Sequence, residues 1–166
     1  MWYPIWLLLR LVTKYFRRDR WPYCQYVDPY NKLVKAKAKE LNYNPIKIMD
    51  FVATIPWKAE KGDTWHRVEE ILSDVSKQQD CEEHAYLWVS LMIASGHRGR
   101  VHCIKGTVYG RYGHLWCAYR MGNLWWEFDT HSQQTPHLFL PEEEDKMSHK
   151  PEFWFDDLGL AWNTEI

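Results

Sequence analysis

The chain has 166 residues, about the size of one domain. Hydrophobic residues make up 46% of it and aromatic residues 16%, which excludes a disordered or collagen-like chain. The formal net charge is −1, so no global field attracts nucleic acid. We expect a single domain over residues 1–166. Four scattered cysteines without a CxxC pair exclude a disulfide scaffold and a closed zinc site: Cys24, Cys81, Cys103 and Cys117.

The N-terminal region carries a short apolar run that ends at Arg10. This run is far shorter than the ~20 residues of a membrane span, and no signal-peptide cleavage pattern follows it. We expect a chain that is synthesised in the cytoplasm without a signal peptide or transmembrane segment, and a bacterial or a phage origin fits equally. Residues 2–16 have one apolar and one basic face, which predicts a helix packed on the domain, with membrane-surface contact as the alternative. We treat residues 1–45 as an N-terminal helical extension.

Four helices are predicted in the first part of the domain. Good helix formers cover residues 30–41, and Pro45 suits the first turn of a second helix that ends before Pro56. Apolar residues at helical spacing predict a third helix over residues 64–75. The fourth runs from about residue 80 to residue 95, with Gly96 as its C-cap. It is apolar nearly all round, so we expect it to be buried.

Strands follow the helices. Segments 100–109, 113–120 and 124–130 have β-type patterns, and Gly122-Asn123 is typical of a tight hairpin turn. Helices followed by an antiparallel sheet predict an α+β domain whose buried helix covers one sheet face. The final residues, 132–166, contain prolines, an acidic run and clustered aromatics. We expect them to form a tail that wraps around the surface.

Three residues in this arrangement are candidates for chemistry. Cys81 lies in the first turn of the buried helix, where unpaired N–H groups and the helix dipole favour a thiolate. If Gly122-Asn123 is a two-residue turn, the numbers of paired residues add up to 245. His114 and Asp129 are then diagonal neighbours on one sheet face, within reach of a side-chain hydrogen bond. An imidazole oriented by a carboxylate beside an activated thiol is typical of acyl-transfer chemistry. The hairpin itself does not place Cys81 there.

Three blocks in this order resemble the Cys, His and Asp blocks of the transglutaminase-like superfamily. They are DCEEHA at 80–85, GHLW at 113–116 and WEFD at 126–129, and the segment 50–72 is similar to the same group. The resemblance is strongest to the bacterial transglutaminase-like cysteine proteinases and covers about residues 46–131. It implies a papain-like α+β catalytic core over these residues. The implied roles are nucleophile for Cys81, general base and acid for His114, and orientation of His114 for Asp129.

The resemblance also implies a reaction. The thiolate would attack an amide carbonyl of a peptide or protein and give a thioester, which water or an amine resolves. The backbone N–H of Cys81 would meet the oxyanion together with an upstream donor. The candidates for oxyanion or substrate contact are Trp65, Gln78, Gln79 and Trp116. We expect no cofactor, except that some relatives bind calcium through acidic residues beside the nucleophile, which Asp80 and Glu82 match in type.

Plainer interpretations stay open. Cys81 can be a small buried apolar residue, and the domain can be a catalytically silent structural or interaction module with a vestigial or blocked triad. A zinc site made of Cys81, His84, His102 and Cys103 is disfavoured, because only the first two have a usual ligand spacing. Solvent access to the Cys81 thiol, and its distance from the His114 ring, distinguish an enzyme from a silent module.

Overall fold

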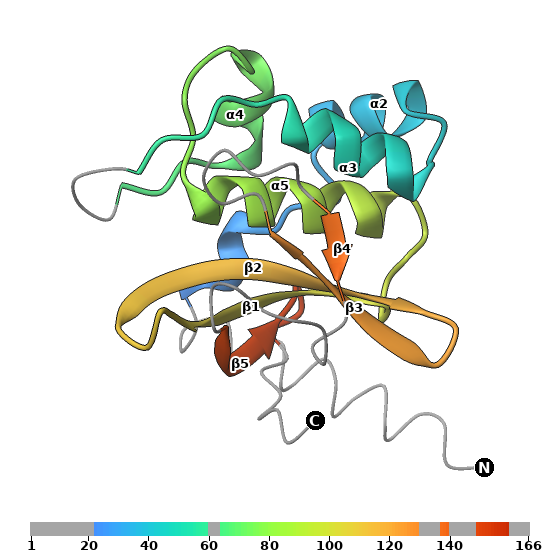
Figure 1. Ribbon diagram of the computed structural model, residues 1–166. Helices are drawn as coiled ribbons and strands as arrows, with labels where there is room; N and C mark the ends of the chain where they lie inside the picture. The colour runs from blue at the N-terminus through green and yellow to red at the C-terminus, as the bar shows by residue number, and fades with distance from the viewer. Residues whose placement is uncertain (1–21, 60–63, 130–136, 140–148, 160–166) are drawn as a thin grey trace.

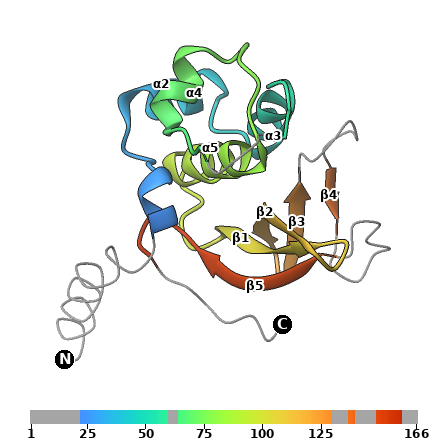
Figure 2. The same ribbon diagram turned by 90° about the vertical axis from the view of Figure 1, so that its left-hand side faces the viewer.

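The computed structural model describes residues 22–59, 64–129, 137–139 and 149–159. A short 3-10 helix, η1 (Pro22–Tyr26), comes first. Three short helices then pack against a longer one, α5 (Cys81–Ala94). On its other side α5 packs on a five-stranded antiparallel sheet, so it lies between two layers (Figure 1). Figure 2 shows the same layers from the side. This is the predicted α+β architecture, and the short helices are α2 (Lys32–Glu40), α3 (Pro45–Ala53) and α4 (Val68–Ser73).

Polar caps start the helices close to the predicted positions. The side chain of Asn31 caps α2, and that of Asn44 caps α3, whose first residue is Pro45. Asp80 caps α5. This helix ends at Ala94 with Ser95 as its C-cap, one residue before the predicted Gly96. Gly96 follows with a φ of 92° and donates its amide to the carbonyl of Ile93. Twelve of the fourteen residues of α5 are buried, which confirms the expectation of a buried helix.

Helix α4 is shorter than predicted. The prediction of a helix from residue 64 was wrong for residues 64–67, which are not helical, and Arg67 has an extended backbone. The ring of Trp65 packs against Tyr23 and Tyr26, with centroid separations of 4.8 and 5.5 Å. The segment therefore crosses the face of η1 instead of adding a turn to α4.

The central strands match the sequence prediction. They are β1 (Val101–Val108), β2 (Tyr112–Met121) and β3 (Leu124–Asp129), joined as an antiparallel meander. Cys117 pairs with Phe128, so the β2–β3 register is the one predicted from a two-residue turn at Gly122-Asn123. This register brings the first part of β2 beside the end of β3.

The C-terminal segment is part of the sheet. β4 (His137–Phe139) pairs with β3, and β5 (Lys150–Phe155) pairs with β1 at the opposite edge. The expectation of a surface-wrapping tail was wrong for β5, because its aromatic residues are used on both sheet faces. Phe155 packs in the core under α5, and Trp154 packs on the outer face. The predicted N-terminal helix and the acidic run lie outside the described residues.

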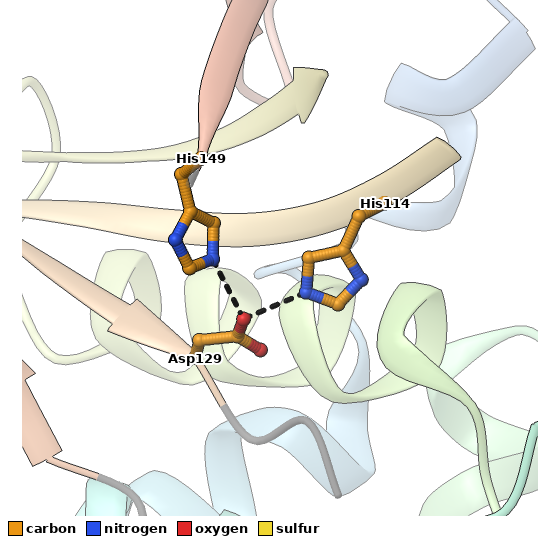
Figure 3. Close-up of side chains that lie close together, drawn as sticks. All are labelled: His114, Asp129 and His149. Carbon is orange, nitrogen blue, oxygen red and sulfur yellow. Dashed lines mark hydrogen bonds and ion pairs between the residues drawn. The ribbon is translucent and has the colours of Figure 1, made fainter. Parts of the chain in front are cut away.

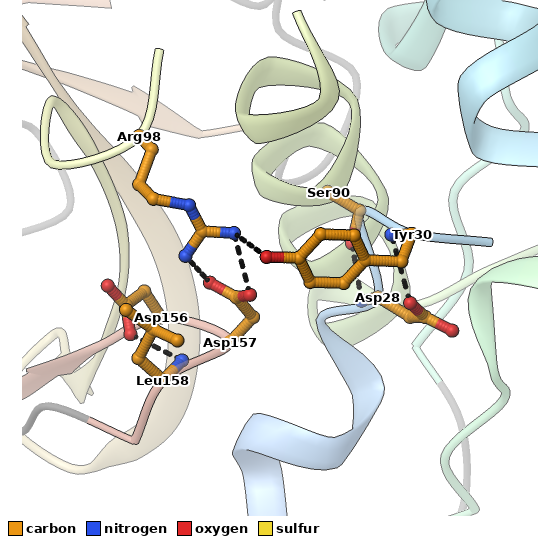
Figure 4. A network of polar contacts seen from close by, with 7 residues as sticks. All are labelled: Asp28, Tyr30, Ser90, Arg98, Asp156, Asp157 and Leu158. Atoms are coloured by element: carbon orange, nitrogen blue, oxygen red, sulfur yellow. Dashed lines mark hydrogen bonds and ion pairs between the residues drawn. The ribbon is translucent and has the colours of Figure 1, made fainter. Parts of the chain in front are cut away.

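A polar network ties the two ends of the described chain to the end of α5 (Figure 4). The guanidinium of Arg98 donates to both carboxylate oxygens of Asp157, at 2.7 and 2.9 Å, and to the hydroxyl of Tyr30 at 3.0 Å. The amide of Asp28 donates to the hydroxyl of Ser90 at 3.0 Å. The segments before α2 and after β5 are therefore fixed to the same helix. Among the described residues, none of the helices has the length and apolar character needed to cross a membrane.

Candidate active site

A cavity of about 520 Å³ opens between the first turn of α5 and the turn that joins β1 to β2. Cys81 and His114 both line it. Its walls combine four aromatic residues with three acidic ones: Trp57, Trp65, Tyr109, Tyr112, Asp80, Glu82 and Glu83. A second, narrow gap is lined by Cys81, His84, Trp116 and Asp129. Cys81 therefore lines the cavity together with His114 and the narrow gap together with Asp129.

The Cys81 thiol is buried and lies among carboxylates. The Asp80 side chain accepts a hydrogen bond from the Cys81 amide, and the thiol donates to Oε2 of Glu82 over 3.0 Å. Burial, with the charges of Glu82 and Asp80, raises the pKa of Cys81 well above its usual range. The expectation that the helix N-terminus favours a thiolate was wrong here, because desolvation and two adjacent negative charges outweigh the helix dipole. The backbone N–H of Cys81, which was expected to donate to an oxyanion, donates to the Asp80 side chain here.

The two acidic neighbours of Cys81 form a candidate cation site. Burial raises the pKa of Glu82 to about 7, and Asp80 contributes to this increase. The ligand atoms of Asp80, Cys81 and Glu82 lie within 4.8 Å of one another. Carboxylate oxygens are the ligands that calcium prefers, and a cation between them would relieve their repulsion. The donor set therefore fits a hard cation and supplies part of its coordination shell.

His114 and Asp129 meet as the hairpin register predicts. Nε2 of His114 lies 2.7 Å from Oδ2 of Asp129 (Figure 3). Burial alone would raise the pKa of Asp129, but hydrogen bonds from His114 and His149 outweigh it and hold this pKa well below its usual range. Because Asp129 is ionised, Nε2 of His114 carries the hydrogen. In a neutral imidazole with its hydrogen on Nε2, Nδ1 is the nitrogen that can accept a proton.

His149 is a site residue that the sequence did not reveal. Its Nε2 lies 2.9 Å from the same carboxylate oxygen, so Asp129 lies between two imidazoles (Figure 3). His149 directly precedes β5 and lies outside the region of resemblance. A histidine next to the clustered aromatics of the C-terminal segment was its only signal in the sequence.

The candidates for oxyanion or substrate contact lie in different places. Trp65 lines the cavity, and its indole Nε1 is buried with no hydrogen-bond partner among the described residues. Trp116 is buried, and its ring stacks on that of His114 with 5.9 Å between the ring centroids. Gln79 is buried too, and its backbone bonds to Pro56 and Lys58, but it is not among the described residues that line the cavity. Gln78 is not among them either.

Glu83 was also missed, although its spacing from Asp80 is that of a helix capping box. Its buried carboxylate accepts the amide of His66 at 2.9 Å and the amide of Asp80 at 3.1 Å. One side chain therefore joins the Trp65 wall of the cavity to the first turn of α5.

No family model and no curated protein sequence matches this chain. Among solved structures it is similar to LapG of Legionella pneumophila, in a calcium-bound and an EGTA-treated form. Both comparisons give a TM-score of 0.59 at 14% sequence identity and cover 74% of this chain. They span 68% and 66% of the LapG chains, about two thirds of their length. The likeness confirms the α+β fold that the sequence predicted.

Proposed function

We propose that this protein is a cysteine hydrolase or acyltransferase that acts on an amide bond of a peptide or protein, with Cys81 as its nucleophile. The observation that carries the proposal is the shared cavity. Cys81 and His114 line the same space, and the imidazole of His114 is held by a buried, ionised Asp129. Nucleophile, base and orienting carboxylate come from the start of α5, from β2 and from the end of β3.

The reaction follows from the protonation states. Because the pKa of Cys81 is raised, attack begins from the thiol and not from a stored thiolate. Nδ1 of His114 takes the thiol proton as Sγ bonds to the carbonyl carbon. The same proton then goes to the departing amine as the C–N bond breaks, which leaves a thioester on Cys81. Water completes hydrolysis, whereas a primary amine completes acyl transfer.

Trp65 is the donor that we assign to the oxyanion. Trp65 lines the cavity, and its indole N–H is buried without a hydrogen-bond partner among the described residues. A donor of this kind is suited to a charge that develops only during the reaction. The Trp65 ring packs against Tyr23 and Tyr26, so its N–H is held in place and needs little movement before it donates a hydrogen bond. The aromatic walls of the cavity favour an extended peptide with apolar side chains beside the bond that is cleaved.

Calcium is the cofactor that we propose. Asp80 and Glu82 would hold it, because carboxylate oxygens are the ligands that calcium prefers. Burial and the charge of Asp80 raise the pKa of Glu82, so a bound cation would relieve an unfavourable negative charge. When bound, the ion would neutralise the two carboxylates that raise the pKa of Cys81 and so make the thiol easier to deprotonate. LapG, which shares the fold, has been solved both calcium-bound and EGTA-treated.

A silent structural module is the alternative. The observation that favours it is the state of Cys81, whose side chain is buried and whose amide and thiol both bond to acidic side chains. A thiol held protonated in this way is a poor nucleophile unless its neighbours are neutralised.

Alkylation by iodoacetamide, followed by intact-protein mass spectrometry with calcium or with EGTA, distinguishes the two functions. Cys81 is 7% exposed, whereas Cys24, Cys103 and Cys117 are 4%, 0% and 1% exposed, so the folded protein should take up one label. We expect labelling that is faster in calcium, absent in Cys81→Ala and at least roughly tenfold slower in His114→Ala. A thiol that stays unlabelled in both conditions, or that reacts equally fast in His114→Ala, would establish the silent module.

A further inference from the structure

The carboxylate of Asp129 has two histidine partners, whereas the proposed reaction uses only one. Oδ2 accepts from His114 at 2.7 Å and from His149 at 2.9 Å. All three side chains are almost fully buried. In Figure 3 the imidazoles approach the carboxylate from two sides, and only His114 belongs to the set predicted from the sequence.

The sheet brings His149 to this position through a close backbone approach. Between Lys105 and Gly106 the register of β1 with β5 shifts. A Cβ on Gly106 would overlap the carbonyl oxygen of Lys150 and lie 2.7 Å from the ring of Trp116. The missing side chain at Gly106 therefore lets the start of β5 pass directly over β1. This passage places His149, the residue before Lys150, beside the end of β3.

Aromatic packing fixes the His149 ring as well. Its centroid lies 4.7 Å from that of Trp116, and the same indole stacks on His114 at 5.9 Å. Among the described residues, Cys81 and His84 line the narrow gap together with Asp129. Burial lowers the pKa of His84 to about 4, so this histidine is neutral at pH 7. His84 therefore adds no positive charge beside Asp129 at pH 7.

We propose that His149 is a positioning residue that holds Asp129, and through it the ring of His114, in the orientation needed for proton exchange with Cys81. The role of His114 rests on the proposed function, whereas the contact between His149 and Asp129 does not. A carboxylate oxygen that accepts hydrogen bonds from two separate segments, β2 and the residue before β5, turns less easily about its terminal torsion than one that accepts from β2 alone. A small displacement of a proton-transfer group lowers the rate of reaction strongly.

Proton NMR tests the positioning directly. Imidazole N–H groups that donate to a buried carboxylate give protected, far-downfield resonances, and we expect one each from His114 and His149. In His149→Ala the His114 resonance should broaden and exchange with water at least roughly tenfold faster, because Asp129 has lost its second anchor. His149→Gln, whose Nε2 remains a donor, should restore much of the protection. An unchanged His114 resonance in His149→Ala would overturn the proposal.

Alkylation of Cys81 tests the consequence. We expect His149→Ala to slow the iodoacetamide reaction roughly tenfold and His149→Gln to recover part of the rate. In an Asp129→Ala background, His149→Ala should add nothing, because His149 acts through Asp129. The matched control is His102→Ala, which removes another buried histidine packed against tryptophans, Trp125 and Trp154, on the outer sheet face. An additive effect in the double variant, or an equal loss in His102→Ala, would reduce His149 to a general packing role.

The two measurements separate the two proposals. If wild-type Cys81 shows no alkylation that depends on His114, the proposed enzyme fails, yet the N–H resonances still decide whether His149 anchors Asp129. If alkylation depends on His114 but is the same in His149→Ala, the enzyme stands and the positioning role fails.

Discussion

The two halves of the candidate site have opposite electrostatics. On the sheet, Asp129 lies between two imidazoles, and its pKa is held well below the usual range. At the start of α5, Asp80 and Glu82 flank a thiol, and the pKa values of Glu82 and Cys81 are raised. A carboxylate with two donors is stabilised as an anion, whereas two carboxylates beside a thiol oppose each other's charge. The pKa shifts of the acidic groups therefore have opposite directions in the two halves of the candidate site.

Removal of Asp129 should have the largest effect, because it leaves two buried imidazoles without their acceptor. We expect Asp129→Ala to lower the free energy of unfolding at pH 7 by about 4 kcal/mol. Since the folded pKa of Asp129 is depressed, this stabilisation is complete above the usual aspartate range near pH 4 and is lost on acidification below it. Urea unfolding at pH 7 and pH 3 measures both. The control is Asp74→Ala, which removes an exposed aspartate and should change the free energy of unfolding very little. An equal loss in both variants would contradict a compensated Asp129.

Gly106→Ala should be nearly as severe, because the added Cβ collides with the backbone of Lys150 and not with a flexible side chain. We expect a loss of about 3 kcal/mol, measured by thermal or urea unfolding, together with weaker anchoring of His149. Gly113→Ala is the matched control, since its Cβ would meet only the end of the Lys105 side chain, at 3.4 Å. If both variants were equally stable, the close passage of β5 over β1 would not be the constraint described above.

Glu82→Gln tests the helix half and should stabilise the protein in EGTA. A glutamate whose folded pKa is about 7 favours its protonated form in the folded state, so wild type loses stability as the pH rises from about 4.5 to 7. The variant does not titrate there. We expect it to be about 2 kcal/mol more stable than wild type at pH 8 and equal to it near pH 4. Calcium should reduce this difference, and a difference that does not vary with pH would contradict a strained acidic pair.

Arg98→Ala should have the smallest effect and touch neither half of the site. It removes a two-point ion pair with Asp157 and leaves this nearly buried carboxylate without its cation. We expect the free energy of unfolding to fall by about 1 kcal/mol, with the rate of Cys81 alkylation unchanged. A large loss of alkylation would show that the anchor at the end of β5 extends as far as His149.

Much of the fold could be predicted from local patterns. The caps at Asn44 and Asp80, the apolar character of α5 and the Gly122-Asn123 turn each depend on a few adjacent residues. The contact between His114 and Asp129 could be predicted too, because a hairpin register fixes all pairs along two strands once the turn is known.

The remainder depends on contacts between distant segments. Residues 64–67 are not helical and include Trp65, which packs against η1, and β5 pairs with β1 across the full width of the sheet from β4. His149 reaches Asp129 only through this pairing, so neither spacing nor alternation indicates it. The direction of the thiol pKa was missed because the helix dipole was considered without the burial of the two carboxylates beside it.

The order of the sheet, β4-β3-β2-β1-β5, also has a consequence for synthesis on the ribosome. Strands β1 to β3 emerge in sequence and pair with their neighbours as they leave the exit tunnel. Strand β5 emerges last and must dock at the far edge, beside the first strand made. Until it docks, Asp129 has only one of its two histidine partners. The nascent chain therefore carries its thiol and His114 well before the cluster around Asp129 is complete.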